Sequence, residues 1–88
     1  MSRTDTLLEF PCRFPIKAFG ERDEAFETTV YELVKPHVPE LERDDLSRRL
    51  SSGGRYVSVT VEIVARSKDQ LDAIYADLSA SERVLMAL

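Results

Sequence analysis

Two cationic side chains and two aromatic rings in this 88-residue chain could together bind a small anion with an apolar tail. Lys17 and Phe19 lie two residues apart in the alternating segment R-F-P-I-K-A-F (13–19), while Arg49 and Tyr56 flank a Ser-Ser-Gly-Gly turn. Ammonium and guanidinium groups bind carboxylates and phosphates through charge-assisted hydrogen bonds. The rings could cover an apolar chain, so the chemistry we expect is binding.

The spacing of apolar residues predicts that these side chains lie on strands of one sheet. Residues 13–19 and 56–63 both alternate between apolar and polar side chains, which is typical of a strand buried on one face. The apolar faces are formed by Phe14, Ile16 and Ala18 and by Val57, Val59, Val61 and Ile63. If those faces pack against helices, the opposite, open face of an antiparallel sheet contains the candidate residues Lys17, Arg49, Tyr56 and Ser58.

Prolines, glycines and capping residues predict where the first elements begin and end. Pro15 has no amide hydrogen, so we expect incomplete pairing of the first strand at that position. Gly20 is expected to end this strand. Asp23 is a plausible N-cap for a helix over residues 23–35, because acidic residues are favoured in the first turn. Pro36 is expected to end the helix.

Four further elements follow in the second half of the chain. Residues 46–51 alternate as a short, half-buried strand, and the turn at 51–54 contains two glycines that can adopt positive φ. Ser67 and Gln70 have the spacing of a capping box at the start of a second helix. Residues 82–88 alternate again and are expected to form the last strand.

The order strand, helix, strand, strand, helix, strand indicates an α+β fold. It is the order of the ferredoxin-like β-α-β-β-α-β plait, in which two helices cover one face of a four-stranded antiparallel sheet. The first and third strands are then central. We expect a single domain over residues 13–88, preceded by a flexible arm over residues 1–12.

Composition and motifs exclude several classes of function. The net charge of -4 argues against a nucleic-acid partner, because such binding depends on neutralising phosphates. No apolar run approaches the roughly 18 residues of a membrane span, so we expect a cytoplasmic protein with no membrane partner. The single cysteine, Cys12, has no local activating partner apart from Arg13. The chain lacks a Walker loop, a HExxH motif and a recognisable Ser-His-Asp arrangement, so we expect no enzyme, metal or cofactor.

Charge is distributed unevenly along the chain. Residues 21–45 contain nine acids and three bases, whereas residues 48–68 contain five bases and one acid. The first helix should therefore be acidic and the central hairpin basic, an asymmetry that can orient a protein partner. The second strand is expected at a sheet edge, and such edges invite pairing with another chain. A homodimer is therefore one further expectation.

Three blocks of the sequence together resemble one family. These are L-L-E-F-P at 7–11 with Phe14, Lys17 and Gly20 at three-residue spacing, S-S-G-G-R-Y-V-S-V at 51–59, and V-L-M-A-L at 84–88. They resemble the YbeD-like family of small bacterial proteins of unknown function. The resemblance implies a ferredoxin-like fold similar to that of ACT regulatory domains, which bind small effectors at subunit interfaces near the first strand-to-helix turn.

The resemblance also directs the functional hypothesis. YbeD-like proteins have been described as lipoate-associated regulators, largely from genomic context. Lys17, Gly20, Tyr56 and Ser58, which together with Arg49 are the candidate ligand-binding residues, lie at positions that look like the family pattern, whereas Arg49 does not. The sequence thus favours a non-catalytic regulatory module that binds a small carboxylate such as lipoate on the open sheet face or at a subunit interface. The alternatives are a protein-interaction adaptor that uses the acidic helix and the basic hairpin, and a sheet face that is merely solvated.

Overall fold

Four antiparallel strands form one sheet, in the order β2-β3-β1-β4. The structure is a computed structural model and describes residues 8–88. Its strands are β1 (Cys12–Glu21), β2 (Leu46–Leu50), β3 (Tyr56–Ala65) and β4 (Met86–Ala87). The helices are α2 (Phe26–Val34) and α3 (Lys68–Ala80), with short 3-10 turns η1 (Lys35–His37) and η2 (Arg43–Asp45) between α2 and β2.

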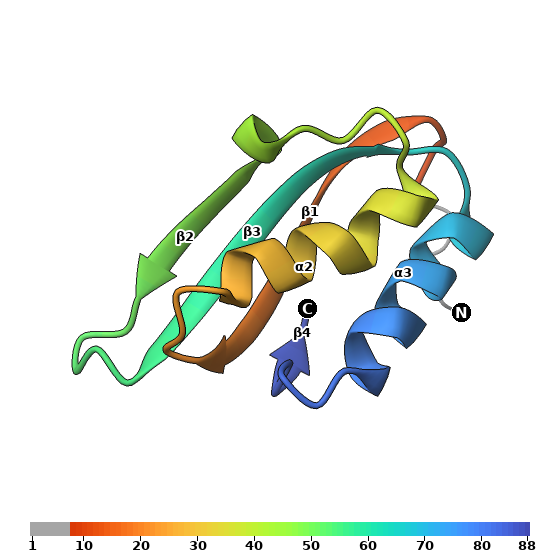
Figure 1. Ribbon diagram of the computed structural model, residues 1–88. Coiled ribbons are helices and arrows are strands. Elements are labelled where there is room, and N and C mark those ends of the chain that lie inside the picture. Colours follow the sequence, from red (N-terminus) through yellow and green to blue (C-terminus); the bar gives the residue numbers. More distant parts are fainter. Residues whose placement is uncertain (1–7) are drawn as a thin grey trace.

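Both helices lie against the same face of the sheet (Figure 1). Their apolar stripes and the inward residues of β1 and β3 form one buried cluster, which includes Ile16, Ala18, Phe26, Val30, Val59, Val61, Ile74 and Leu78. The central position of β1 and β3 and the edge position of β2 follow from the strand order. The expected ferredoxin-like α+β fold is therefore confirmed.

The β1–β3 pairing is longer than the sequence predicts. It runs without interruption from Cys12 opposite Ala65 to Glu21 opposite Tyr56. The incomplete pairing expected at Pro15 is therefore wrong. Arg22 N donates to Arg55 O at 2.9 Å, and alternate residues of an antiparallel strand point toward and away from the partner. The backbone nitrogen of Pro15 thus points away from β3. The β1–β3 pairing therefore needs no hydrogen bond from this nitrogen.

The predicted arm and the predicted strand ends also need correction. Cys12 belongs to β1 and is not in an arm, and Gly20 does not end the strand, because the pairing continues to Glu21. Phe10 packs against the core but belongs to no strand or helix of the described residues. The rest of the predicted flexible arm, residues 1–7, lies outside the described residues.

Helix α2 begins later than expected. Its N-cap is Ala25, without a side-chain hydrogen bond. Asp23 instead closes the preceding turn, where its Oδ1 accepts from Ala25 N at 2.8 Å and its carboxylate pairs with Arg83. Because Asp23 is held by Arg83 near the far end of the chain, it ties the start of α2 to the segment that leads into β4.

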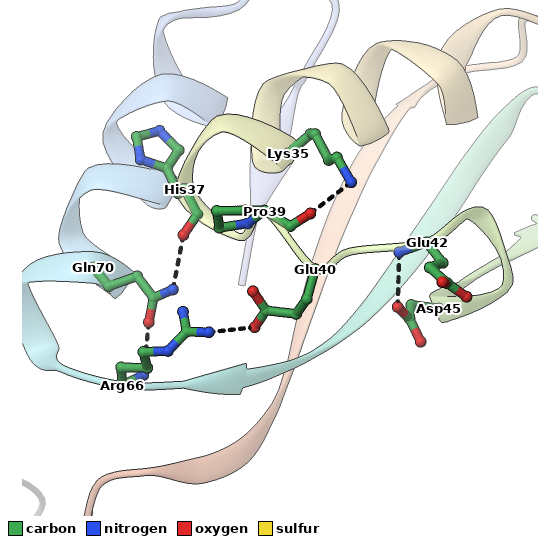
Figure 2. Close-up of polar contacts among 8 residues, drawn as sticks. All are labelled: Lys35, His37, Pro39, Glu40, Glu42, Asp45, Arg66 and Gln70. Atoms are coloured by element: carbon green, nitrogen blue, oxygen red, sulfur yellow. Dashed lines mark hydrogen bonds and ion pairs between the residues drawn. The ribbon is translucent and has the colours of Figure 1, made fainter.

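Polar contacts fix the connection between α2 and β2 (Figure 2). Lys35 Nζ donates to the carbonyl oxygens of Pro39 and Leu41, both at 2.7 Å. Gln70 Nε2 on α3 donates to His37 O at 2.9 Å, and Arg66 pairs with Glu40 at 2.8 Å (Figure 2). The connection is therefore fastened to α3 and to the residue that follows β3.

In the second half of the chain, the expected start of the second helix and the expected turn at 51–54 are confirmed. Ser67 caps α3 by accepting from Gln70 N at 3.0 Å, while Gln70 Oε1 accepts from Arg66 N at 2.6 Å. In a standard capping box the Gln70 side chain would accept from the amide of Ser67. Here it accepts from the amide of Arg66, one residue earlier. Only Gly54 of the two turn glycines has positive φ, at +75°.

Two of the predicted strands differ from expectation in burial. Leu46 is the only buried residue of β2, so the strand is mostly exposed rather than half-buried. At the end of the chain, β4 contains only Met86 and Ala87. Val84 is buried and precedes the strand, while Met86 is 51% exposed. The alternation predicted for residues 82–88 is therefore wrong at Val84, because a bend at Leu85 separates this residue from β4.

Candidate functional site

Three candidate side chains meet in one row across the open face of the sheet. Ser58 on β3 is paired with Arg49 on β2 and with Phe19 on β1. Paired residues of an antiparallel sheet project to the same face. The opposite face of the same strand is formed by the buried residues Val57 and Val59, which pack under the helices. The open face therefore presents a cation, a hydroxyl and a ring side by side.

This row lines a hollow with a volume of about 400 Å³. The walls are formed by Phe19, Arg49, Leu50, Ser51, Ser52, Tyr56, Val57 and Ser58. A volume of this size lies within the usual range for small-molecule sites, about 300–1,000 Å³. Polar and apolar groups both contribute, so the hollow is suited to a ligand with a charged head and an apolar body.

Lys17 lies on the same face but one row away. It pairs with Thr60 on β3, and its backbone exchanges two hydrogen bonds with Leu88, at 3.0 and 2.8 Å. Its side chain is exposed and does not line the hollow. Within residues 8–88 neither Lys17 nor Arg49 has an ion-pair partner. Both cations are therefore available to an anion, with Arg49 at the wall and Lys17 beside it.

Gly20 is brought to the other side of the sheet. It is buried opposite Val57, and a Cβ atom at this position would lie 2.7 Å from both Phe26 Cζ and the Arg83 carbonyl oxygen. Such separations are not tolerated by real Cβ atoms. The structure thus supplies a packing reason for this glycine, and places it away from the hollow that Arg49, Tyr56 and Ser58 line.

Part of the wall of the hollow could not be predicted from the sequence. Leu50, Ser51 and Ser52 line it because the end of β2 is held beside Tyr56, where Ser51 N donates to Tyr56 O at 2.9 Å. The Ser-Ser-Gly-Gly turn was visible in the sequence, but only the register of β2 on β3 places its first two serines there. Leu50 pairs with the buried Val57 and so projects to the helix side, as the alternation at 46–51 indicates, but at this sheet edge it is 42% exposed.

The hairpin end is also rich in arginine. Arg22 N donates to Arg55 O at 2.9 Å, so Arg22 lies beside the base of the β2–β3 turn. Together with Arg48, Arg49 and Arg55 it forms a group that we call the hairpin arginines. In the described part of the chain none of these four has an ion-pair partner, whereas Arg66 and Arg83 do.

The groups with shifted pKa lie outside the hollow. The pKa of Asp23 is lowered by the hydrogen bond from the Ala25 amide and by Arg83, and that of Glu40 is lowered by the hydrogen bond from Arg66. Burial raises the pKa of Tyr75 on α3. No cluster of three or more potential metal-ligating side chains occurs among residues 8–88, and no helix there is long and apolar enough to cross a membrane.

Comparison with known proteins assigns the chain to a family. Residues 5–88 match the family described as "Protein of unknown function (DUF493)". A UPF0250 protein of Chromobacterium violaceum is 49% identical over 82 residues, covering 93% of this chain and 92% of that protein. This chain belongs to the DUF493 family, that is, the UPF0250 or YbeD-like proteins.

Other members of the UPF0250 family and one solved structure extend the comparison. A UPF0250 protein of Pseudomonas aeruginosa is 48% identical, covering 92% of this chain and 88% of its own, and one of Neisseria gonorrhoeae is 39% identical, covering 94% and 91%. The solution structure of protein HP0495 from H. pylori matches with a TM-score of 0.69 at 13% identity. It covers 100% of this chain and 96% of that one, and supports the fold alone.

Proposed function

We propose that this UPF0250 protein is a non-catalytic regulatory module of the cytoplasm that binds a small carboxylate with an apolar tail in the open-face hollow. The observation that supports this most directly is the row of Arg49, Ser58 and Phe19, which combines an available cation, a hydroxyl and a ring. The carboxylate would accept hydrogen bonds from the Arg49 guanidinium. The apolar tail would lie against Phe19 and Tyr56.

Lipoate and octanoate are the ligands we would test first. Both have a carboxylate and an apolar chain, and lipoate is the compound that the YbeD-like resemblance implies. Lipoamide provides a matched control, because it keeps the tail and lacks the negative charge. Lipoate or octanoate should raise the melting temperature in a saturable way, and lipoamide should do so much less. Absence of a shift with both carboxylates at millimolar concentration would contradict the proposal.

Adjacent arginines of β2 provide a matched pair of variants. Arg49 lines the hollow, whereas Arg48 pairs with Val59 and projects to the other face. Hydrogen bonds to charged groups are worth about 1.5–3 kcal/mol, so Arg49→Gln should weaken carboxylate binding by roughly 10-fold or more. Arg48→Gln should leave the affinity within about 2-fold. Equal effects of the two variants would point to a diffuse electrostatic contribution instead.

A second candidate function is favoured by the hairpin arginines. Four exposed arginines without ion-pair partners among the described residues lie at the β2–β3 hairpin end of a chain of net charge -4, with Arg48 and Arg49 projecting from opposite faces of the sheet. We infer that these arginines serve a protein-interaction adaptor whose partner is acidic. Capture of a specific partner should then weaken with salt and in Arg55→Glu, but not in Arg13→Glu. A partner retained by Arg55→Glu would contradict this electrostatic adaptor.

A further inference from the structure

The outer edge of β2 has backbone groups that no other element of the described residues uses. β2 ends the strand order, and no element of residues 8–88 lies beyond it (Figure 1). Ser51 N donates to Tyr56 O at 2.9 Å, which fixes the alternation along the strand. Ser47 and Arg49 therefore point their backbone groups toward β3, while Arg48 and Leu50 point theirs outward.

The two adjacent arginines of β2 project from opposite faces of this edge. Arg48 is paired with the buried Val59 and thus projects to the helix side, whereas Arg49 is paired with Ser58 on the open side. Neither has an ion-pair partner in the described part of the chain. A strand added to this edge would therefore meet one cation on each of its own faces, at consecutive positions.

A second copy of this chain is a poor occupant of the edge. Antiparallel self-pairing centred on Arg48 places it opposite its own copy, and pairing centred on Arg49 does the same for that residue. Like charges directly opposite each other destabilise a sheet. The edge thus discourages self-pairing, and its charge is complementary to an acidic strand.

We propose that the outer edge of β2 binds an extended acidic segment of a partner protein by strand addition. This deepens, and rests on, the adaptor function inferred above. The added strand hydrogen-bonds to the outward backbone groups of Arg48 and Leu50. Two consecutive acidic residues pair with Arg48 and Arg49, and a neighbouring apolar residue covers Leu50, which is 42% exposed. The recognised pattern is apolar–acidic–acidic, in an extended segment.

The pattern can be tested by selecting random 12-residue peptides, displayed on phage, against the full chain. Enriched peptides should contain two adjacent acids beside an apolar residue. A synthetic version of the most enriched peptide should bind Arg48→Glu at least 10-fold more weakly than the wild type. Arg13→Glu is the matched control, because it makes the same charge change on β1, two strands away from the edge, and should bind normally.

The geometry can be tested by amide hydrogen exchange, read by NMR, on the complex with that synthetic peptide. The Arg48 and Leu50 amides should become at least 10-fold more protected, while those of Ser47 and Arg49 should change little. N-methylation of one alternate set of peptide amides should abolish binding, and methylation of the other set should be tolerated, because only every second amide of an added strand faces β2.

Each other outcome overturns the proposal in a distinguishable way. Acidic peptides that bind without protecting the Arg48 and Leu50 amides would exclude strand addition and leave the electrostatic adaptor standing. Selection of peptides without acidic residues would contradict both the strand addition and the electrostatic adaptor. Protection of these amides that rises with protein concentration, without any peptide, would show that a second copy occupies the edge.

Discussion

Gly20 on β1 and Phe26 at the start of α2 are packed so closely that a Cβ atom on Gly20 would lie 2.7 Å from Cζ of the ring. The Arg83 carbonyl oxygen would lie at the same distance, and backbone cannot move aside easily. Overpacking of this kind typically costs about 1–3 kcal/mol. Gly20→Ala should therefore lower the free energy of unfolding by that amount in a urea titration.

Gly53→Ala is the matched control for this glycine, because nothing lies within 4 Å of a Cβ atom at position 53. It should change the free energy of unfolding by less than about 0.5 kcal/mol. If Gly20→Ala were as stable as the wild type but had lost carboxylate binding, the role of Gly20 would be in the ligand site and not in packing.

A substitution that fills the hollow should show whether the ligand binds there or elsewhere on the open face. Ser58 lines the hollow, whereas Thr60, two residues along the same face of β3, does not. Ser58→Leu should weaken binding of lipoate or octanoate by about 10-fold or more, because the added side chain occupies the space for the tail. Thr60→Leu should bind within about 2-fold of the wild type. The measurement is isothermal titration calorimetry, and equal binding by Ser58→Leu would place the ligand elsewhere.

Local signals predicted the elements, and tertiary relationships explain the differences. The alternation of Val57, Val59 and Val61 and the Ser67–Gln70 spacing were sufficient to place β3 and the start of α3, because each depends on neighbours in sequence. The effect of Pro15 on strand pairing could not be predicted from the sequence. It depends on whether the backbone nitrogen at position 15 points toward β3 or away from it.

The candidate site was predictable only in part for the same reason. Tyr56 and Ser58 could be assigned to the open face from alternation alone, as could Lys17. Whether each lines the hollow depends on the register of β2 on β3, which places Arg49 beside Ser58 and leaves Lys17 one row away. Gly20 had no local reason to be a glycine, because its close neighbours come from α2 and from the segment before β4.

The N-cap of α3 should make a measurable contribution to stability. Ser67 accepts a hydrogen bond from Gln70 N at 3.0 Å, and loss of such a cap costs about 1 kcal/mol. Ser67→Ala should therefore lower the free energy of unfolding by about that amount. Ser79→Ala, at an exposed position within the same helix, should be neutral or slightly stabilising because alanine favours helix. Equal effects of the two variants would contradict the capping role.

The Asp23–Arg83 pair should make part of the stability dependent on acid. The hydrogen bond from Ala25 and the interaction with Arg83 hold the pKa of Asp23 below its ordinary value of 3.8 in the folded chain. A carboxyl group whose pKa is lowered by folding stabilises the folded state fully above its unfolded pKa, and this contribution is lost as the pH falls through the folded pKa. Asp23→Asn should therefore melt below the wild type at pH 6, with the difference shrinking as the pH falls below about 3.8. Thermal melts of both proteins between pH 6 and pH 2 provide the measurement, with Asp44→Asn as an exposed control. A difference in melting temperature that stays constant over this range would show that the charge of Asp23 does not contribute.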